Sequence, residues 1–357
     1  MPEPEPPSTA PGAPAGRAPA VTVAIPVRDG GALLARTLAA LARQTVAHEL
    51  LVCDSGSRDG SVAVAHAHGA RVLEIAPEEF GHGRTRNLLL AQACGVHVAL
   101  LTQDAEPADE RWLEHLLAGF ALADDVGLVY GPYRPRPDAS AAVRLELEAW
   151  FRSLSADGAP RVERLGERER ALSTQELARV RGFELAGRRG FFTDANACVA
   201  RAAWERVPFR EVAIAEDRAL ALDMLRAGYA KAYVPDAGVV HSHAYAPLEH
   251  LRRSFDEWWG LREVYGWREP ASPRHLASQL RGALGPARRE LRAARAGPSR
   301  RAATLAAVGA HHTVRLTGAL LGSRAERLPP GVRRRLSREG HAGCAPPTLD
   351  SDHVNRS

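Results

Sequence analysis

Cysteine is scarce in this chain, and its placement offers no cysteine-based site. Four cysteines occur in 357 residues, and no two of them stand at CxxC or any other metal-ligand spacing. Three lie in apolar stretches, where a small buried thiol is the usual role. The four are Cys53, Cys94, Cys198 and Cys344. This usage indicates a reducing compartment.

A long apolar run is also missing. A membrane-spanning helix requires roughly 18–20 consecutive apolar residues, and the best candidate, residues 302–321, is interrupted by His311, His312 and Arg315. The N-terminus is acidic and rich in proline, without the apolar core of a secretory signal. We therefore expect a cytoplasmic protein that is soluble or is held peripherally on the inner face of the cell membrane.

Positive charge is concentrated near the C-terminus. The whole chain has a formal charge of +5, yet residues 275–340 contain 14 Arg, no Lys and three acidic residues, a local charge of +11. The remainder is mildly acidic, which argues against a nucleic-acid-binding domain, because such a domain needs cations around its binding face. The Arg-rich segment predicts contact with anionic lipid or an anionic partner, and a solvated, weakly ordered tail is the alternative.

Short β-branched runs alternate with helical patterns over the first part of the chain. Strands are predicted at residues 21–27, 49–54, 71–75 and 96–102, and helices at 32–44, 61–67, 84–95 and 109–122. This alternation predicts an α/β fold with a doubly wound, mostly parallel sheet and right-handed crossovers. No GxGxxG follows a strand, which argues against a dinucleotide-dependent oxidoreductase.

The pattern is looser in the second half. Residues 140–182 have a helical and polar character with a mobile stretch around 155–166, and 231–245 read as a late strand pair. An amphipathic helix is predicted at 248–267. We expect four segments, namely a disordered tail (1–20), the α/β domain (21–268), a basic helical extension (269–341) and a second disordered tail (342–357).

Three carboxylates stand where a parallel sheet binds its ligands, at or just beyond the carboxyl ends of predicted strands. They are Asp29, Asp54 and Asp104. Asp54 can accept hydrogen bonds from a nucleobase or ribose, although its Asp-Ser-Gly context also suits a plain turn. Asp104 can hold Mg²⁺ or Mn²⁺ beside the diphosphate of a nucleotide that donates a group. Alternatively, Asp104 serves only as a helix cap before Pro107.

Two further groups of polar residues occur later in the chain. Glu216 and Asp217 open a predicted helix, where a carboxylate can serve as general base toward an acceptor hydroxyl or can simply stabilise the helix N-terminus. His241 and His243 end a predicted strand and face the same side if that strand runs straight. Neutral imidazoles there can join a carboxylate around a divalent ion.

Five motifs, taken in order, resemble those of one known family. They are AIPVRDGGALLARTLAAL, VCDSGSRDGS, FGHGRTRNLLL, LLTQDAEP and AEDRALALDMLRAGY. They are similar to the motifs of family 2 inverting glycosyltransferases with the GT-A fold, over about residues 21–267. FGHGRTRN and LTQDA, followed by HSHAY, resemble the rhamnosyltransferase branch in particular. The resemblance implies the nucleotide-diphospho-sugar transferase fold with a helical C-terminal extension.

The resemblance also implies catalytic and metal-binding roles. Asp217 would be the catalytic base, supported by Glu216. Asp104 and His241 would hold the metal, Mg²⁺ or Mn²⁺. Thr102 stands where the family's DXD metal motif has its first acid, which leaves one carboxylate fewer for the ion.

The donor site implied by the resemblance draws on several segments. Asp54 would bind the nucleobase, with Pro26 and Arg28 in the first donor-site loop, and Arg86 would counter phosphate charge near a helix start. The implied donor-binding residues are Pro26, Arg28, Asp54, Ser55, His82, Arg86, Asn87, Gln103 and Asp104.

These expectations describe a metal-dependent inverting transferase. Its sugar, with rhamnose from dTDP-rhamnose as the first candidate and UDP-sugars next, would move to a hydroxyl of a glycan or lipid-linked acceptor in cell-envelope or surface polysaccharide synthesis. One alternative is a non-catalytic nucleotide-sugar-binding or membrane-associated scaffold, which Thr102 would favour. Another is a nucleotidyltransferase, although IPVRDGG offers only Arg28 as a phosphate-loop cation. No nucleic acid partner is expected.

Overall fold

The computed structural model describes residues 20–182 and 184–338. The two predicted disordered tails, 1–20 and 342–357, lie outside these residues except for Ala20, as do Cys344 and the last residues of the predicted extension. Within the described ranges, no helix combines the length and the apolar character needed to cross a membrane.

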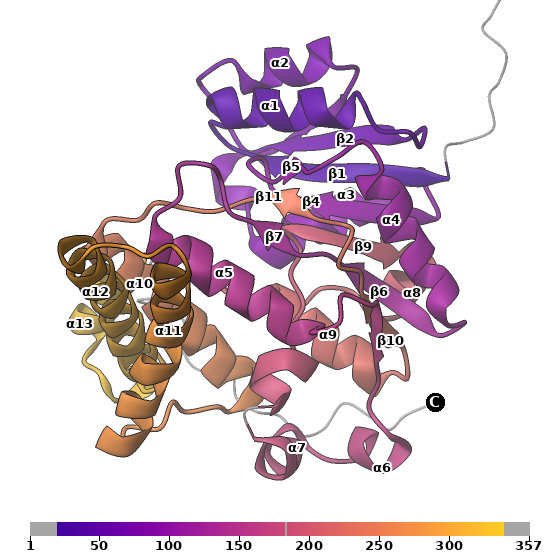
Figure 1. Ribbon diagram of the computed structural model, residues 1–357. Coiled ribbons are helices and arrows are strands. Elements are labelled where there is room, and N and C mark those ends of the chain that lie inside the picture. The colour runs from indigo at the N-terminus through magenta and orange to yellow at the C-terminus, as the bar shows by residue number, and fades with distance from the viewer. Residues whose placement is uncertain (1–19, 183, 339–357) are drawn as a thin grey trace, which may run out of the picture.

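An eight-stranded, mostly parallel sheet forms the centre of the molecule, in the order β3-β2-β1-β4-β9-β6-β10-β8 (Figure 1). Its strands are β1 (Val21–Val27), β2 (Glu49–Asp54), β3 (Arg71–Glu74), β4 (His97–Leu101), β6 (Val126–Tyr130), β8 (Arg161–Glu163), β9 (Asn196–Ala200) and β10 (Ala230–Tyr233). Only β8 and β9 run antiparallel to their neighbours in this described sheet. The predicted α/β fold is therefore confirmed, and the four early strands closely match their predicted bounds.

Helices cover both faces of this sheet, and two hydrophobic clusters lie between the layers. The helices are α1 (Gly31–Leu41), α2 (Ser61–Ala67), α3 (His82–Gln92), α4 (Trp112–Ala118), α5 (Ala141–Leu154), α6 (Glu167–Arg170), α7 (Thr174–Arg181), α8 (Arg201–Arg206), α9 (Glu216–Arg226), α10 (Pro247–Tyr265), α11 (Pro273–Ala293), α12 (Pro298–Gly322) and α13 (Pro330–Leu336). Short 3₁₀ or π turns occur at Pro77–Glu79, Gly119–Leu122, Leu185–Arg189 and Ala325–Arg327. α1 and α4 pack on one face, and α3, α8 and α9 pack on the other.

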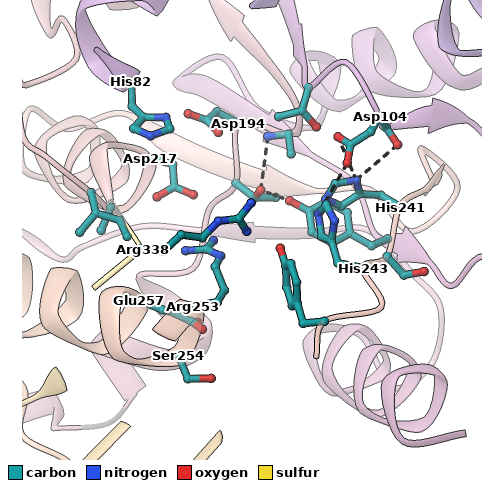
Figure 2. A pocket seen from close by; sticks show the side chains of 18 of the residues that line it. His82, Asp104, Asp194, Asp217, His241, His243, Arg253, Ser254, Glu257 and Arg338 are labelled. Carbon is teal, nitrogen blue, oxygen red and sulfur yellow. Dashed lines mark hydrogen bonds and ion pairs between the residues drawn. The ribbon is translucent and has the colours of Figure 1, made fainter. Parts of the chain in front are cut away.

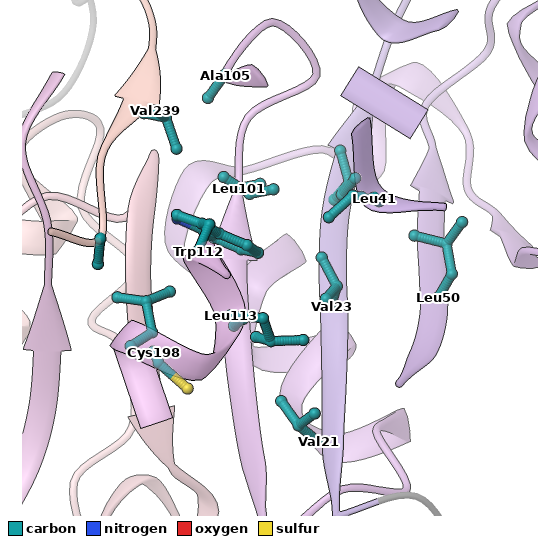
Figure 3. Packing of buried hydrophobic residues seen from close by; sticks show 14 of the residues in the cluster. Val21, Val23, Leu41, Leu50, Leu101, Ala105, Trp112, Leu113, Cys198 and Val239 are labelled. Carbon is teal, nitrogen blue, oxygen red and sulfur yellow. The ribbon is translucent and has the colours of Figure 1, made fainter. Parts of the chain in front are cut away.

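The central strands are mostly apolar because both of their faces are covered, although Thr22 and Asn196 are buried polar residues among them. On one face, Val21 and Val23 of β1 pack in the same cluster as Leu101 of β4 and Trp112 of α4 (Figure 3). The indole Nε1 of Trp112 donates a 2.8 Å hydrogen bond to Oδ1 of Asn196. This buried contact fixes the start of β9, and with it the polar segment that precedes β9.

The structure departs from the sequence predictions at several points. The stretch 140–182, predicted to be helical, is interrupted by β8, because this short strand pairs with the edge strand β10. The predicted strand pair at 231–245 is divided between two sheets, since only β10 belongs to the large one. Cys53 and Cys198 are buried thiols as expected, whereas Cys94 is exposed, because its neighbour Gly95 is the residue that packs against β1.

A small second sheet lies at the carboxyl end of β4. It has the order β5-β11-β7 and is made of β5 (Glu106–Pro107), β7 (Tyr133–Arg134) and β11 (Val239–Val240). Because β11 pairs with both of the other strands, the chain that follows it is brought next to the loop between β4 and β5. This sheet positions the residues described below.

The helices α10 to α13 form a layer beside α5 (Figure 1). α12 lies so close to α10 that a Cβ added at Gly318 would stand 2.6 Å from Cβ of Ser254. Arg315 of α12 pairs with Glu146 of α5 at 2.8 Å. The predicted helical extension is therefore confirmed, and it is packed against both α10 and α5.

Candidate active site

A cavity of about 1220 Å³ opens at the carboxyl ends of β1, β2 and β4. The residues that follow these strands form one wall, while α5, α9, α10, α12 and the segment after α13 contribute to the others. This is the position where a doubly wound sheet binds its ligands. Most of the residues selected from the sequence lie in its walls.

Asp104, His241 and His243 meet at one side of this cavity (Figure 2). Nδ1 of His241 lies 3.5 Å from Oδ1 of Asp104, and Nε2 of His243 lies 3.6 Å from Oδ2. One potential ligand atom from each residue lies within 4.8 Å of the others. The small sheet explains the meeting, because Val240 of β11 pairs with Glu106 of β5, close behind Asp104. The prediction that the two histidines face the same side is confirmed.

The protonation of this cluster suits a cation. Burial lowers the pKa of His241 below its ordinary value, and burial lowers the pKa of His243 to about 4. Burial alone would raise the pKa of Asp104, but the neighbouring histidines bring it below its ordinary value. At neutral pH the cluster therefore offers one carboxylate and two neutral imidazoles, a ligand set that suits a divalent ion.

Asp217 lies across the cavity from this cluster, in the first turn of α9 (Figure 2). Ala215, at the start of this helix, has a left-handed backbone (φ 63°, ψ 31°), so the chain turns sharply as it enters α9 at the cavity wall. Burial raises the pKa of Asp217 to about 6, and the negative charge of Asp194 adds to this rise while Arg218 opposes it. A carboxylate with a pKa close to the working pH is well suited to general base catalysis.

Arg86 lies in the wall between two carboxylates. Its Nε is 2.5 Å from Oδ2 of Asp194, and a terminal nitrogen is 3.2 Å from Oε1 of Glu216. All three side chains are almost fully buried. Burial raises the pKa of Asp194 above its ordinary value, and the charge of Arg86 opposes this rise. The geometry therefore does not favour the phosphate contact predicted for Arg86, because its charge already faces Asp194 and Glu216.

Gln103, the residue before Asp104, holds the loop that follows β1. The side-chain oxygen of Gln103 accepts a hydrogen bond from the backbone N–H of Arg28 (2.9 Å), and its amide nitrogen donates to the carbonyl of Arg28 (3.1 Å). The structure thus joins two of the predicted donor-site segments. The predicted donor-binding residues that line the cavity are Pro26, Arg28, Ser55, His82, Arg86, Gln103 and Asp104.

Asp54 lies behind Ser55 and is not part of the cavity lining. Its Oδ2 accepts hydrogen bonds from the backbone N–H groups of Gly56 and Ser57, both at 2.9 Å. Its Oδ1 is buried and has no hydrogen-bond partner among the residues that the structure describes. A buried carboxylate oxygen without a partner is costly, and a ligand donor at this position would satisfy it.

Asn87 makes structural contacts rather than lining the cavity. Its Nδ2 donates to the carbonyl of Phe209 (2.9 Å), and its Oδ1 accepts from the N–H of Phe209 (3.0 Å) and from Nε1 of Trp204 (2.8 Å). Both ends of the amide are therefore occupied in joining α3 to α8 and the loop behind it. The donor contact predicted for Asn87 finds no support in this geometry.

The structure adds residues that the sequence pattern did not single out. Asp194 lies in the sequence TDAN, just before β9. The only sequence feature that could have pointed to it was a carboxylate next to a strand. Others come from α5, α10 and the C-terminal extension, including Glu146, Arg253, Glu257, Arg315 and Arg338. Of these segments, only 248–267 was predicted to have an apolar face, and no local pattern predicted which segments would pack around the cavity.

Comparisons with known proteins agree with the geometry. A family model described as glycosyl transferase family 2 matches residues 22–193. The O-antigen chain rhamnosyltransferase RfbN of Salmonella typhimurium is 31% identical over 242 residues, which cover 66% of this chain and 70% of the relative. The O-antigen chain rhamnosyltransferase WbaN of Salmonella anatum is 32% identical over 211 residues, covering 58% of this chain and 61% of the relative.

Among solved structures, a mannosyltransferase from Pyrobaculum calidifontis, determined with GDP-Man and Mn²⁺, has a similar fold. The TM-score is 0.53 at 20% sequence identity, and the match covers 87% of each chain. This likeness supports the GT-A architecture, with a mostly parallel sheet and a helical C-terminal region. Together with the family model and the Salmonella relatives, it confirms the resemblance stated from the motifs: the chain is a glycosyltransferase and belongs to family 2.

Proposed function

We propose that this glycosyltransferase moves rhamnose from dTDP-rhamnose to a hydroxyl of a glycan or lipid-linked acceptor, in the synthesis of a surface polysaccharide. The Salmonella relatives, which are O-antigen chain rhamnosyltransferases, support this choice of sugar. The observation that carries the proposal is the placement of the Asp104–His241–His243 cluster and Asp217 on opposite sides of one cavity. UDP-sugars are the second class of donor.

The base of the donor nucleotide would be recognised by Asp54. Its unpartnered Oδ1 can accept a hydrogen bond from a ring N–H, and thymine and uracil both carry one. Pro26, Arg28 and Ser55 line the neighbouring wall. Gln103 would hold the Arg28 loop against the nucleotide through the two hydrogen bonds that it makes with that residue.

A divalent cation fits the cluster at the other side of the donor site. Asp104, His241 and His243 would hold it, and His243 extends the ligand set expected from the sequence. Two imidazoles favour Mn²⁺ over Mg²⁺, because Mg²⁺ takes oxygen ligands almost exclusively. When bound, such an ion stabilises negative charge on a departing diphosphate.

The reaction is a single displacement at the anomeric carbon of the sugar. Asp217 accepts the proton of the acceptor hydroxyl while the hydroxyl oxygen forms a bond to that carbon. The bond between this carbon and the diphosphate oxygen breaks, and its electron pair leaves with the nucleoside diphosphate. Because the attacking and leaving groups stand on opposite faces, the configuration inverts. Glu216 and Asp194 hold Arg86 near Asp217, the catalytic base, and contribute to the charge around that base.

Asp194 should contribute, together with burial, to the pH dependence of Asp217 as the base. A kcat/KM profile is expected to rise with pH through about 6, because Asp217 must be deprotonated to accept a proton. Asp194→Asn removes a negative charge that raises the pKa of Asp217, so the rise should move to lower pH. The shift is measured from kcat/KM of the variant and the wild type between about pH 4 and about pH 8, the range in which carboxyl groups and histidines ordinarily titrate. A profile that does not move would show that Asp194 has no electrostatic influence on the base.

The Arg-rich extension is proposed to rest on an anionic membrane surface at the inner face of the cell membrane, near a lipid-linked acceptor. Exposed arginines of α11 and of the first turn of α12 support this, namely Arg281, Arg288, Arg289, Arg292, Arg300 and Arg301. We expect the protein to sediment with vesicles containing phosphatidylglycerol and to be released by salt, since exposed charges are screened. Equal sedimentation with purely zwitterionic vesicles would contradict electrostatic binding.

We also propose that the catalytic domain ends at residue 268 and that the extension begins after it.

The donor class is tested by thermal unfolding of the protein with dTDP, UDP, GDP and ADP, each with and without Mn²⁺. A ligand that binds only the folded state adds about 2.7 kcal/mol at a hundredfold excess over its Kd. We expect dTDP or UDP to raise the midpoint in a Mn²⁺-dependent way and the purine nucleotides to have little effect. Stabilisation by GDP alone would contradict the proposed recognition of a pyrimidine base.

A further inference from the structure

Not every charged side chain of the cavity has a role in the reaction above. Asp194 and Glu216, the carboxylates near Asp217, face the buried guanidinium of Arg86. Two arginines that the reaction above does not use, Arg253 and Arg338, line the same cavity. In Figure 2 their side chains appear between Asp217 and the two histidines of the cluster.

Both arginines lie close to the histidine cluster. The ring of His243 stacks on the ring of Tyr245, with the two ring centres 5.0 Å apart. The guanidinium carbon of Arg338 lies 5.6 Å from the centre of the Tyr245 ring. Burial raises the pKa of Tyr245, and the positive charges of Arg253 and Arg338 both oppose that rise. The two guanidiniums therefore share one neighbourhood, although 85 positions separate them in the sequence.

Arg338 is positioned through its backbone. Its N–H donates a 2.7 Å hydrogen bond to Oδ2 of Asp256, a fully buried residue of α10. Nearby, Nε of Arg252 donates to the carbonyl of Arg335 at 3.0 Å. The end of the extension is thus fastened to α10, and these contacts do not depend on the Arg338 guanidinium.

The guanidinium of Arg338 forms a weak ion pair with Glu249. The two groups lie 3.4 Å apart and their side chains are 46% and 42% exposed. Exposed ion pairs of this kind contribute little, so an anionic ligand can compete for the guanidinium. Arg86 is the contrasting case, since it is buried between two carboxylates.

We infer that Arg253 and Arg338 form a binding site for the diphosphate of the nucleotide-sugar, and that the C-terminal extension thereby completes the donor site. The inference rests on the proposed function. A guanidinium can donate two parallel hydrogen bonds to phosphate oxygens. As the bond to the sugar breaks, the diphosphate gains negative charge, and these two cations would offset it. The pair thus supplies the phosphate contact that the sequence motif assigned to Arg86.

The same chemistry could come from a phosphate carried by a lipid-linked acceptor. The position of the pair near the histidine cluster (Figure 2) favours the donor diphosphate, because that cluster would hold a cation that stabilises negative charge on the diphosphate. The experiment must therefore separate binding of the donor from binding of the acceptor.

The test compares Arg338→Ala with the wild type by calorimetry, using dTDP and thymidine as probes in the presence of Mn²⁺, and UDP and uridine in parallel. We expect the variant to bind the diphosphate on the order of tenfold more weakly, the loss of a charge-assisted hydrogen bond, and to bind the nucleoside as the wild type does. Arg334→Ala is the matched control, because Arg334 is exposed on α13 and does not line the cavity. Arg253→Ala should resemble Arg338→Ala.

Thermal unfolding without ligand establishes that Arg338→Ala keeps its fold, as expected from the backbone anchor at Asp256. Unchanged diphosphate affinity in both arginine variants would overturn the inference. Unchanged diphosphate affinity combined with a raised KM for a phosphate-bearing acceptor would also overturn it, and would assign the pair to the acceptor. Failure of the wild type to bind either diphosphate would instead refute the proposed function itself.

Discussion

Replacing Asp217 by Asn is expected to lower the kcat of sugar transfer by about 10²–10⁴-fold while leaving donor binding close to that of the wild type. The amide has the shape of the carboxylate but cannot accept the proton of the acceptor hydroxyl. Asp217 lies across the cavity from the Asp104 cluster, so the nucleotide should bind as before. The measurements are the rate of nucleoside diphosphate release at saturating donor and the Kd of that donor by calorimetry.

Asp223→Asn is the matched control for this prediction. Asp223 belongs to the same helix, α9, but pairs with Arg210 at 2.5 Å and does not line the cavity. The same chemical change at Asp223 should leave kcat near its wild-type value. Near wild-type transfer by Asp217→Asn at saturating donor would rule out Asp217 as the base.

Asp104→Asn is expected to remove the Mn²⁺ dependence of nucleotide binding and to lower kcat/KM by about 10²–10³-fold. Among the described residues, Asp104 is the only carboxylate of this cluster. Thr102 stands where the family motif has its other acidic residue. Two neutral imidazoles alone bind a hard cation weakly. The measurements are calorimetric titration with Mn²⁺ and with dTDP, each in the presence and absence of the other.

Two comparisons sharpen this result. Asp138→Asn changes an exposed carboxylate outside the cavity and should have no effect on metal or nucleotide binding. His243→Ala should weaken Mn²⁺ binding less than Asp104→Asn, because it removes a neutral ligand and leaves the charge in place. If Asp104→Asn bound Mn²⁺ and dTDP as the wild type does, the ion would have to lie elsewhere.

The part of the site that follows from local sequence was predicted well. The apolar runs of β1, β2 and β4 end where polar residues begin, and the carboxyl ends of parallel strands share one edge of a sheet. That rule alone is sufficient to place Asp104 at the ligand-binding edge. The spacing of His241 and His243 was equally informative, because alternate residues of an extended segment face the same side.

The rest depended on packing between distant segments. Arg253 and Arg338 reach the cavity because α10 and the end of the extension are joined by Asp256, a contact that no local pattern reveals. The pairing of Arg86 with Asp194 arises because β9 inserts antiparallel between β4 and β6 and brings the preceding TDAN segment beside α3. Sequence similarity identified Arg86 as a residue of the site, but its buried partners indicate a positioning role.

A crystal structure of the protein with Mn²⁺ and dTDP, in which the anomalous signal of manganese locates the ion, tests the proposed site most directly. We expect the ion at Asp104, His241 and His243, with the base at Asp54 and the diphosphate facing Arg253 and Arg338. Asp217 should then lie on the opposite side of the space left for the sugar. An ion or a nucleotide bound outside this cavity, in crystals of the folded protein, would contradict the proposed site.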